Sequence, residues 1–277
     1  MNSAVLSDRW QLKSVADVTL KAAARFWFVV AVIGQWAFLY YIFAFYGPST
    51  VSGNFQAWTR NTFLIKGYVA GDTAGNLTFA AHALLAGVTS FGGALQLIPQ
   101  IRARAIAFHR WNGRFFLLTA LAVSFSGLYM EWVRGAQMNL AGAIGVSLNA
   151  VLIILFAALA WRFARRREIP THRRWALRTY LVANAQWFTR VGFIAWVLVS
   201  RKLFGIGDRL DGQFFLIWGF GSYLLPLAVL ELYLRANESA GPRGRLAVAG
   251  GLVALTMLMA VGIFGVATFM WLPLLRG

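Results

Sequence analysis

The chain has 277 residues, of which 59% are hydrophobic and 13% are charged. Soluble domains have about 45–50% apolar and about 25% charged residues, so the composition excludes an ordinary soluble fold. The net charge of +17 would indicate nucleic acid in a soluble protein, but the charges cluster between apolar stretches, and we expect no nucleic-acid partner. The chain has no cysteine, which excludes disulfides, thiolate metal sites and Cys nucleophiles.

Seven largely uncharged stretches have about the 20 residues that cross a bilayer. Each must be helical, because lipid offers no partner for an unpaired backbone group. We therefore predict an all-α fold, a polytopic transmembrane bundle of seven helices that forms one domain over residues 1–277. The predicted spans are 26–46, 77–98, 115–133, 140–161, 179–199, 213–234 and 246–272.

The basic residues alternate between the two ends of these spans in an unequal way. With the amino terminus placed inside, the inside segments carry 18 of the 26 Lys and Arg residues and the outside segments carry seven. Such asymmetry is what the positive-inside rule describes. It predicts a multi-pass protein of the bacterial inner membrane with a cytoplasmic amino terminus and an outer carboxyl terminus. The arginines favour anionic lipids as partners.

Two segments outside the spans have their own patterns. Residues 1–25 alternate apolar and charged positions at roughly helical spacing, which predicts an amphipathic leader on the inner membrane surface, with a frayed polar tail as the alternative. Residues 47–76 form the longest loop, placed outside and bounded by turn-forming glycines. Its aromatic middle predicts an interfacial helix, which is either a lid over the outer mouth or a passive anchor.

One cation lies inside a span. Arg190 falls near the middle of the fifth span, with Gln186 one turn earlier on the same face. An unpaired Arg there costs at least about 2.5–3.5 kcal/mol, so it needs carbonyls, water or an anionic ligand. His82 lies on the second span within about 6 Å of Arg190 in depth, at 1.5 Å per residue. We predict an outer polar pocket of His82, Gln186 and Arg190 for a quinone or lipid headgroup or a small anion, with helix packing and snorkelling of Arg190 as the alternative.

Two similar basic clusters precede outward-running spans. The first reads His-Arg-Trp-Asn-Gly-Arg over 109–114, and the second reads His-Arg-Arg-Trp-Ala-Leu-Arg over 172–178. Their offset of 63 residues indicates a parallel internal repeat. Both clusters are placed in inner loops, 99–114 and 162–178, so the two histidines are expected to meet at the inner interface.

These clusters support a redox hypothesis. A bis-histidine haem needs two imidazoles facing each other at one membrane depth, and His109 with His172 meets that condition. Haem propionates or a quinone headgroup would be held by arginines. The leading hypothesis is an integral membrane redox protein that binds haem b or a quinone at the inner interface, with no metal beyond a haem iron. The expected cofactor residues are His109, His172, Arg110, Arg114, Arg173 and Arg178.

The paired clusters resemble a bacterial family known only as a multi-pass membrane domain of unknown function, over roughly residues 76–235. That resemblance implies an inner-membrane helical bundle and no particular activity. The chain is also distantly similar to b561-type and ferric-reductase cytochromes, in which histidines on neighbouring helices hold haem. Two bis-histidine haems need four histidines, and this chain has three.

Two alternatives remain open. One is a non-enzymatic accessory subunit or anionic-lipid-binding protein, with a redox partner or partner subunit in the membrane. The other is a small-anion transporter that uses Arg190. The sequence contains no Gly-x-Ser-x-Gly, no His-Glu-x-x-His and no phosphate-binding loop, so it predicts no hydrolase and names no catalytic residue.

Overall fold

A computed structural model describes residues 3–62, 66–136, 139–200 and 212–276, with side chains from residue 12 onward. Every regular element in these ranges is helical, which confirms the all-α prediction. The long helices are α1 (Ser3–Val51), α2 (Thr73–Leu97), α4 (Ile106–Trp132), α5 (Leu140–Arg165), α6 (Ile169–Ala183), α7 (Ala185–Ser200), α8 (Gln213–Ser239) and α9 (Pro242–Val266). Shorter elements are η1 (Phe55–Arg60), α3 (Pro99–Arg104), η2 (Ala267–Trp271) and α10 (Leu272–Leu275).

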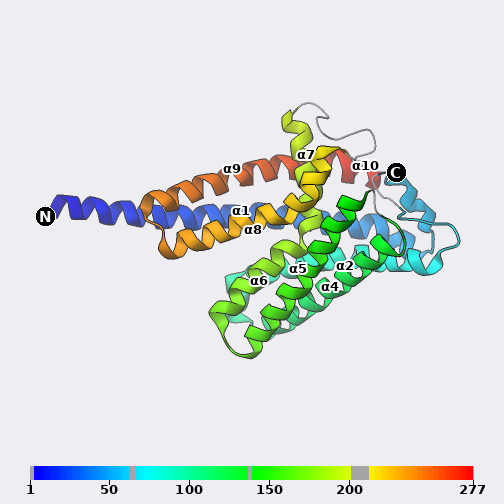
Figure 1. Cartoon of the computed structure of the whole chain (residues 1–277), viewed down its shortest axis with the longest axis horizontal. Coiled ribbons are helices and arrows are strands. Elements are labelled where there is room, and N and C mark those ends of the chain that lie inside the picture. The colour runs from blue at the N-terminus through cyan, green and yellow to red at the C-terminus, as the bar shows by residue number, and fades with distance from the viewer. Residues whose placement is uncertain (1–2, 63–65, 137–138, 201–211, 277) are drawn as a thin grey trace.

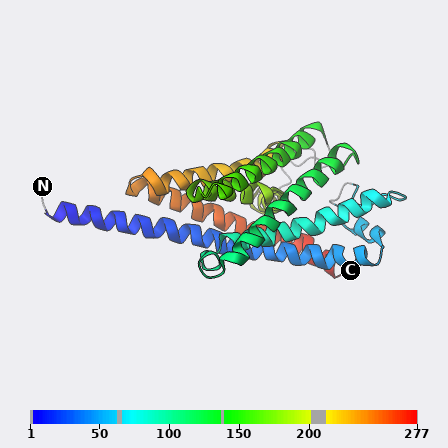
Figure 2. The ribbon, with the colours of Figure 1, turned by 90° about the horizontal axis from the view of Figure 1, so that it is seen from below.

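Six of the described helices are long and apolar enough to cross a membrane, namely Leu12–Val51, Thr73–Leu97, Ile106–Trp132, Leu140–Arg165, Gln213–Ser239 and Pro242–Leu275. The bent pair α6 and α7 makes a seventh crossing if it counts as one span. The molecule is therefore a multi-pass bundle with six to seven candidate membrane-spanning helices. Figure 1 and Figure 2 show the two termini at opposite ends of the bundle.

Helices that follow one another in the chain pack side by side along one part of the bundle, from α1 to α2, α4, α5 and α6. The carboxyl-terminal helices then return to the start, because α9 packs along α1 and α7. Figure 1 shows α1, α8 and α9 with their axes nearly parallel, and α8 runs antiparallel to the other two. Helices α2, α4, α5 and α6 form a second group, which diverges from the first toward the end of the bundle where the amino terminus lies.

The predicted leader is not a separate helix. Residues 12–25 continue without a break into the first span as part of α1, since no Gly or Pro interrupts them. Leu20 and Ala23 are buried against the turn between α8 and α9, and Asp17 forms an ion pair with Arg245. These contacts explain why this segment extends α1 rather than forming an independent surface helix.

The long outer loop is shorter than predicted, since α1 runs to Val51 and α2 begins at Thr73. Pro48 is tolerated close to the end of α1, where few hydrogen bonds are lost. The expected interfacial helix is the short turn η1, and Trp58 in it is buried and donates from Nε1 to Ser49 Oγ at 2.7 Å. This part of the loop therefore packs onto the bundle and is not an exposed membrane anchor.

The two inner basic segments are also helical, contrary to the prediction of loops. Pro99 begins α3 and Pro170 lies in the first turn of α6, positions at which a missing amide costs no hydrogen bond. Consequently His109 lies in the first turn of α4 and His172 in the first turn of α6.

The predicted fifth span, 179–199, is helical but is divided between α6 and α7. The chain bends by 55° at Asn184, between α6 and α7. The Asn184 backbone amide still donates to carbonyls of the preceding turn, while its side-chain Nδ2 donates to the Tyr180 carbonyl at 2.8 Å. A bend at membrane depth is tolerated where the freed backbone groups are buried in protein or line a cavity.

Candidate functional site

A cavity of about 250 Å³ lies among α1, α2, α4 and the bend between α6 and α7. The structure places all three residues of the predicted outer pocket, His82, Gln186 and Arg190, on its wall. His82 is nine residues from the start of α2 and Arg190 is ten residues from Ser200, so both lie about 14–15 Å from the outer helix ends. The remaining wall is mainly apolar and aromatic, with Phe38, Tyr46, Phe79 and Trp187 among its residues.

The imidazole of His82 is oriented by α4. Its Nδ1 lies 2.9 Å from Ser126 Oγ, and Ser126 Oγ in turn donates to the Ala122 carbonyl at 2.7 Å. The Val123 carbonyl, at 3.2 Å, is a second acceptor for the Ser126 proton. With this proton used on a backbone carbonyl, the hydroxyl accepts from His82, and we assign the imidazole proton to Nδ1 on that basis. Gly127 provides the space beside the ring, since a Cβ there would lie 3.4 Å from His82 Cε1. Nε2 is therefore a bare hydrogen-bond acceptor on a side chain that lines the cavity.

Arg190 is held beside the same cavity by its own helix and by α1. Its Nη1 donates to the Gln186 carbonyl at 2.7 Å, and its guanidinium carbon lies 5.6 Å from the centre of the Phe38 ring. The backbone carbonyl and the aromatic face partly compensate the charge. No carboxylate pairs with Arg190 among the described residues. The remaining guanidinium N–H groups are available to a ligand.

The bend supplies two polar side chains to the cavity that the sequence did not reveal. Asn184 and Trp187 are each 1% exposed and line the cavity. Asn184 Oδ1 and Trp187 Nε1 are buried and have no hydrogen-bond partner in the described part of the chain. Gln35 on α1 accepts a hydrogen bond from Tyr180 at 2.8 Å, and its Nε2 is likewise unpaired. Unpaired polar atoms are costly in an apolar interior, so they mark a place where a polar group binds.

The outer side of the cavity carries two opposite charges, Lys66 and Glu131. Lys66 donates from Nζ to the Arg134 carbonyl at 3.2 Å, and no ion pair of Glu131 occurs among the described residues. Lys66 lies in the loop more than sixty residues before Glu131, so only the folded chain places both on the wall of one cavity.

The segment after Lys66 is tied to the bundle by Arg134. The Arg134 guanidinium is 4% exposed and bonds Asp72 Oδ2 at 3.0 Å, the Gly67 carbonyl at 3.2 Å and Asn76 Oδ1. Asp72 is the N-cap of α2 and accepts from the Gly75 amide at 2.8 Å. That amide, and after it Arg134, lower the pKa of the Asp72 carboxyl below its ordinary value. This part of the predicted loop is therefore tied to the start of α2 and to the segment that follows α4.

The second predicted site lies at the other end of the bundle. His109 and His172 come from the first turns of α4 and α6, and their imidazoles are close enough to interact electrostatically. His172 Nδ1 donates to the Ala160 carbonyl at 2.8 Å, which leaves its Nε2 free. His109 Nδ1 is buried without a partner among the described residues.

The arginines expected to serve this inner site are engaged in different ways. Arg178 pairs with Glu231 of α8 at 2.8 Å and lies over the Trp175 ring, while Arg114 lies over the Trp111 ring at 4.6 Å. Arg110 and Arg173 are exposed and have no ion pair in the described ranges. Arg114 and Arg178 thus contact neighbouring side chains, whereas Arg110 and Arg173 are exposed at the surface.

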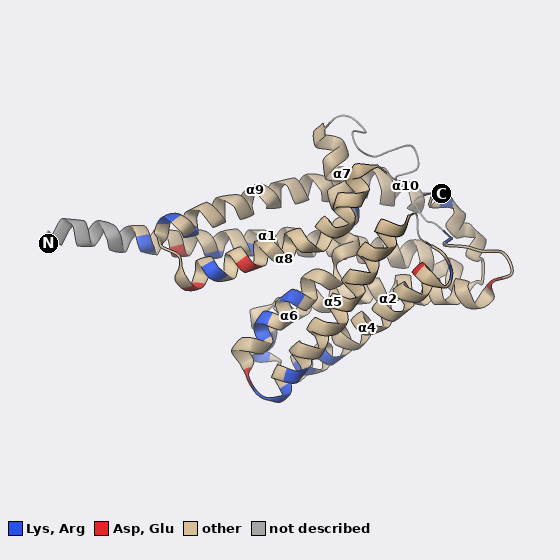
Figure 3. Ribbon diagram, viewed as in Figure 1, with Lys and Arg blue, Asp and Glu red and all other residues tan. Residues whose placement is uncertain are grey.

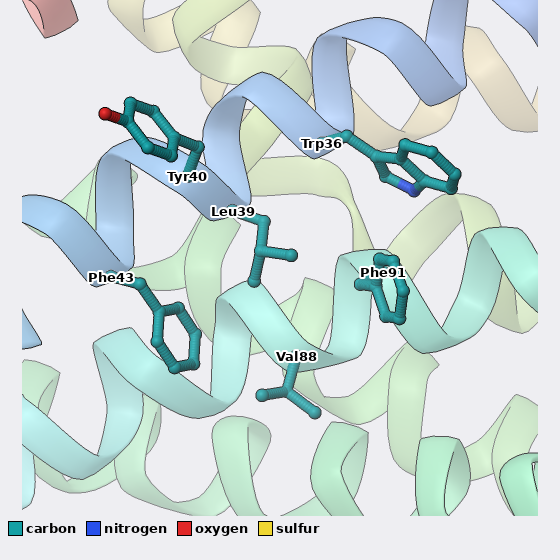
Figure 4. Close-up of a pocket in the computed structure, with 6 residues that line it drawn as sticks. All are labelled: Trp36, Leu39, Tyr40, Phe43, Val88 and Phe91. Atoms are coloured by element: carbon teal, nitrogen blue, oxygen red, sulfur yellow. The ribbon is translucent and has the colours of Figure 1, made fainter.

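A second hollow lies on the outside of the bundle between α1 and α2. Figure 4 shows Trp36, Leu39, Tyr40 and Phe43 from α1 beside Val88 and Phe91 from α2. It has a volume of about 420 Å³, and its lining is almost entirely apolar. Such a surface suits acyl chains of the surrounding lipid and brings no polar chemistry to the site. Among the described residues, no group of three or more His, Asp or Glu side chains is arranged to hold a metal ion.

Residues 79–211 match the model of a protein family described as "Predicted membrane protein (DUF2306)". The matched segment is just under half of the chain and contains His82, His109, His172 and Arg190, but not Lys66. The expected similarity to a membrane protein family of unknown function is confirmed at this level. No curated protein and no solved structure matches the chain.

Proposed function

We propose that this protein is an integral membrane redox protein of the bacterial inner membrane that binds a quinone-type molecule, with the ring of that molecule in the outer cavity. The observation that carries the proposal is the cavity itself. It combines an imidazole nitrogen of His82 that is free to accept with the guanidinium of Arg190, which bonds the Gln186 carbonyl but has no ion pair among the described residues. Lipid-soluble molecules with a polar ring are the ligands that reach such a position.

The size and lining of the cavity support a single-ring headgroup. Small-molecule pockets usually span about 300–1,000 Å³, with apolar walls and a few placed polar groups. At about 250 Å³ this cavity is slightly smaller than that range, which suits one ring better than a porphyrin. Aromatic side chains on the wall offer flat faces for a ring to stack on. The leading hypothesis from the sequence had the quinone at the inner interface. We now favour the outer pocket, which the sequence also predicted for a quinone headgroup, because the cavity lies there.

The orientation in the membrane is part of the proposal. The starts of α4, α6 and α9 and the ends of α5 and α8 lie at one end of the bundle, where Figure 3 shows many of the Lys and Arg residues. The positive-inside rule makes that end cytoplasmic, together with the amino terminus. Three of the expected outer cations, Arg201, Lys202 and Arg209, lie outside the described residues.

Binding of a short-chain quinone tests this function. Purified protein in detergent is titrated with decylubiquinone and decylubiquinol, and binding is measured by calorimetry and thermal stabilisation. We expect Arg190→Gln to weaken binding of both forms by about tenfold or more, since it removes a donor to a ligand oxygen. We expect His82→Ala to weaken binding of the quinol, since it removes the acceptor of a ligand hydroxyl. His172→Ala, at the far end of the bundle, is the matched control. If neither quinone nor quinol binds the wild-type protein, the proposal is wrong, and stabilisation by small carboxylates that depends on Arg190 would favour anion transport.

A second candidate function, a bis-histidine haem b site, rests on the inner pair. The Ala160 carbonyl orients His172 with Nε2 free, as partners of metal-binding histidines do, and His109 lies within electrostatic reach. His109 and His172 would hold the iron, which would supply one-electron chemistry, and Arg110 with Arg173 would contact the propionates. A haem absorption spectrum lost in His109→Ala or His172→Ala, but kept in His82→Ala, supports this function. A purified protein without haem absorption excludes it.

The arginines of the inner end also make anionic phospholipids the expected lipid partners. Arg114 over Trp111 and Arg178 over Trp175 hold guanidinium groups beside aromatic rings, an arrangement that suits the interface of a membrane. Trp111 is 67% exposed and is therefore open to lipid. If the protein binds neither haem nor quinone but retains anionic lipid, the accessory or lipid-binding role replaces the redox proposal.

A further inference from the structure

Two acceptor atoms on side chains that line the outer cavity receive no hydrogen bond from any described residue. The first is His82 Nε2, which is unprotonated in the tautomer that we assign, with Nδ1–H donating to Ser126 Oγ while Ser126 donates to a backbone carbonyl of α4. The second is Asn184 Oδ1 at the bend between α6 and α7.

The identity of the Asn184 acceptor follows from its other bond. The two ends of an amide side chain are told apart only by their partners. One end of Asn184 lies 2.8 Å from the Tyr180 carbonyl, which accepts but cannot donate, so this end must be Nδ2. The oxygen is therefore the end left buried and unpaired, on a side chain that lines the cavity.

A quinone and its reduced form fit these acceptors unequally. A quinone has two carbonyl oxygens, which only accept, so it would leave His82 Nε2 and Asn184 Oδ1 unpaired when it displaces water. A quinol has two hydroxyl groups, each of which donates one bond and accepts others. The same hydroxyl oxygens can accept from the Trp187 indole N–H and from Arg190. Sites with buried groups that need a hydroxyl discriminate strongly against the analogue that lacks it.

We propose that the outer cavity selects the reduced, hydroxyl-bearing quinol over the oxidised quinone, through the acceptors His82 Nε2 and Asn184 Oδ1. This inference rests on the proposed function, since it concerns the redox state of the same ligand class. It assigns a binding role to Asn184, which composition and spacing in the sequence did not indicate, and it gives the bend in the span a chemical purpose.

Paired affinities test the inference. Decylubiquinol, under anaerobic reducing conditions, and decylubiquinone are titrated into the purified full-length protein. We expect the quinol to bind about tenfold more tightly or better. His82→Phe and Asn184→Leu each keep the side-chain shape but remove one acceptor, and each is expected to bring the two affinities to within about threefold of each other.

The control is Asn149→Leu. Asn149 is also a buried asparagine with an unpaired Oδ1, but it does not line the cavity, so the quinol preference should persist. Thermal unfolding identifies any variant that is misfolded. The comparison of quinol and quinone affinities in the wild-type protein does not depend on the variants. Equal affinities, or tighter binding of the quinone, would overturn the inference while leaving quinone-type binding intact. Binding of neither form would instead overturn the proposed function.

Discussion

The guanidinium of Arg134 and the carboxylate of Asp72 lie 3.0 Å apart at the outer end of the bundle, and Arg134 is almost entirely buried while Asp72 is partly exposed. Arg134 follows α4 and Asp72 caps α2. This one side chain therefore joins the end of α4, the start of α2 and the loop segment at Gly67.

Replacing this arginine is expected to destabilise the outer end. Arg134→Gln leaves the Gly67 carbonyl and the Asn76 amide oxygen short of a buried donor, at a cost of about 1–3 kcal/mol in the free energy of unfolding. Thermal unfolding in detergent measures the loss. Arg276→Gln removes an exposed cation from the same end and should leave stability unchanged. Equal effects of the two substitutions would contradict the role given to Arg134.

Asp72 should make stability depend on pH in the acid range. Its folded pKa is lowered below the ordinary value of 3.8 by the Gly75 amide and then by Arg134. A lowered pKa contributes stability that is fully present above the unfolded value and is lost as the pH falls through the folded value. We expect the melting temperature to fall below about pH 4. This acid-dependent component should be smaller in Asp72→Asn, measured by thermal unfolding between pH 6 and pH 3.

The contact between α7 and α9 requires glycine at position 262. A Cβ there would lie 2.3 Å from the Val191 carbonyl oxygen and 2.8 Å from Val191 Cγ1. Gly262→Ala should therefore separate these helices and cost about 1–3 kcal/mol. Gly250→Ala, on the same helix with no atom within 4 Å of the new methyl group, should be neutral or slightly stabilising. Melting temperatures of the two variants decide the matter, and an unaffected Gly262→Ala would show that the helices do not approach so closely.

The proposed orientation has a direct test, because the chain contains no cysteine of its own. Single cysteines are placed at Gln56 and Ser239, two exposed positions at opposite ends of the bundle. A membrane-impermeant maleimide should label Gln56→Cys in intact spheroplasts, whereas Ser239→Cys should react only after the membrane is permeabilised. The reverse pattern would invert the proposed topology.

The class of fold was predictable from the sequence because the length and apolarity of a span are local properties. The common depth of His82, Gln186 and Arg190 was predictable for the same reason, since residue counts along a helix set the depth of each side chain. The bend at Asn184 was not, because neither Gly nor Pro marks it. The place of Glu131 and Lys66 on the same cavity wall was not predictable, because Lys66 belongs to a loop far away in the sequence.

The inner clusters show how a correct residue can be assigned to the wrong kind of element. His109 and His172 were expected in loops because arginines surround them, yet both lie in the first turns of helices. Pro99 begins α3, the short helix before α4, and Pro170 lies in the first turn of α6; both were visible in the sequence and are typical of a first turn. Side-chain proximity between the two histidines was expected from the common depth of the clusters, and the folded chain brings them into electrostatic reach.

The bend at Asn184 divides one membrane crossing between two groups of helices. On one side of it α6 packs mainly along α5, and on the other side α7 packs mainly along α9. Asn184 therefore joins a helix that packs along α5 to a helix that packs along α9, and it also contributes to the cavity wall. The cavity thus lies where the two groups of helices meet, and its wall takes residues from both.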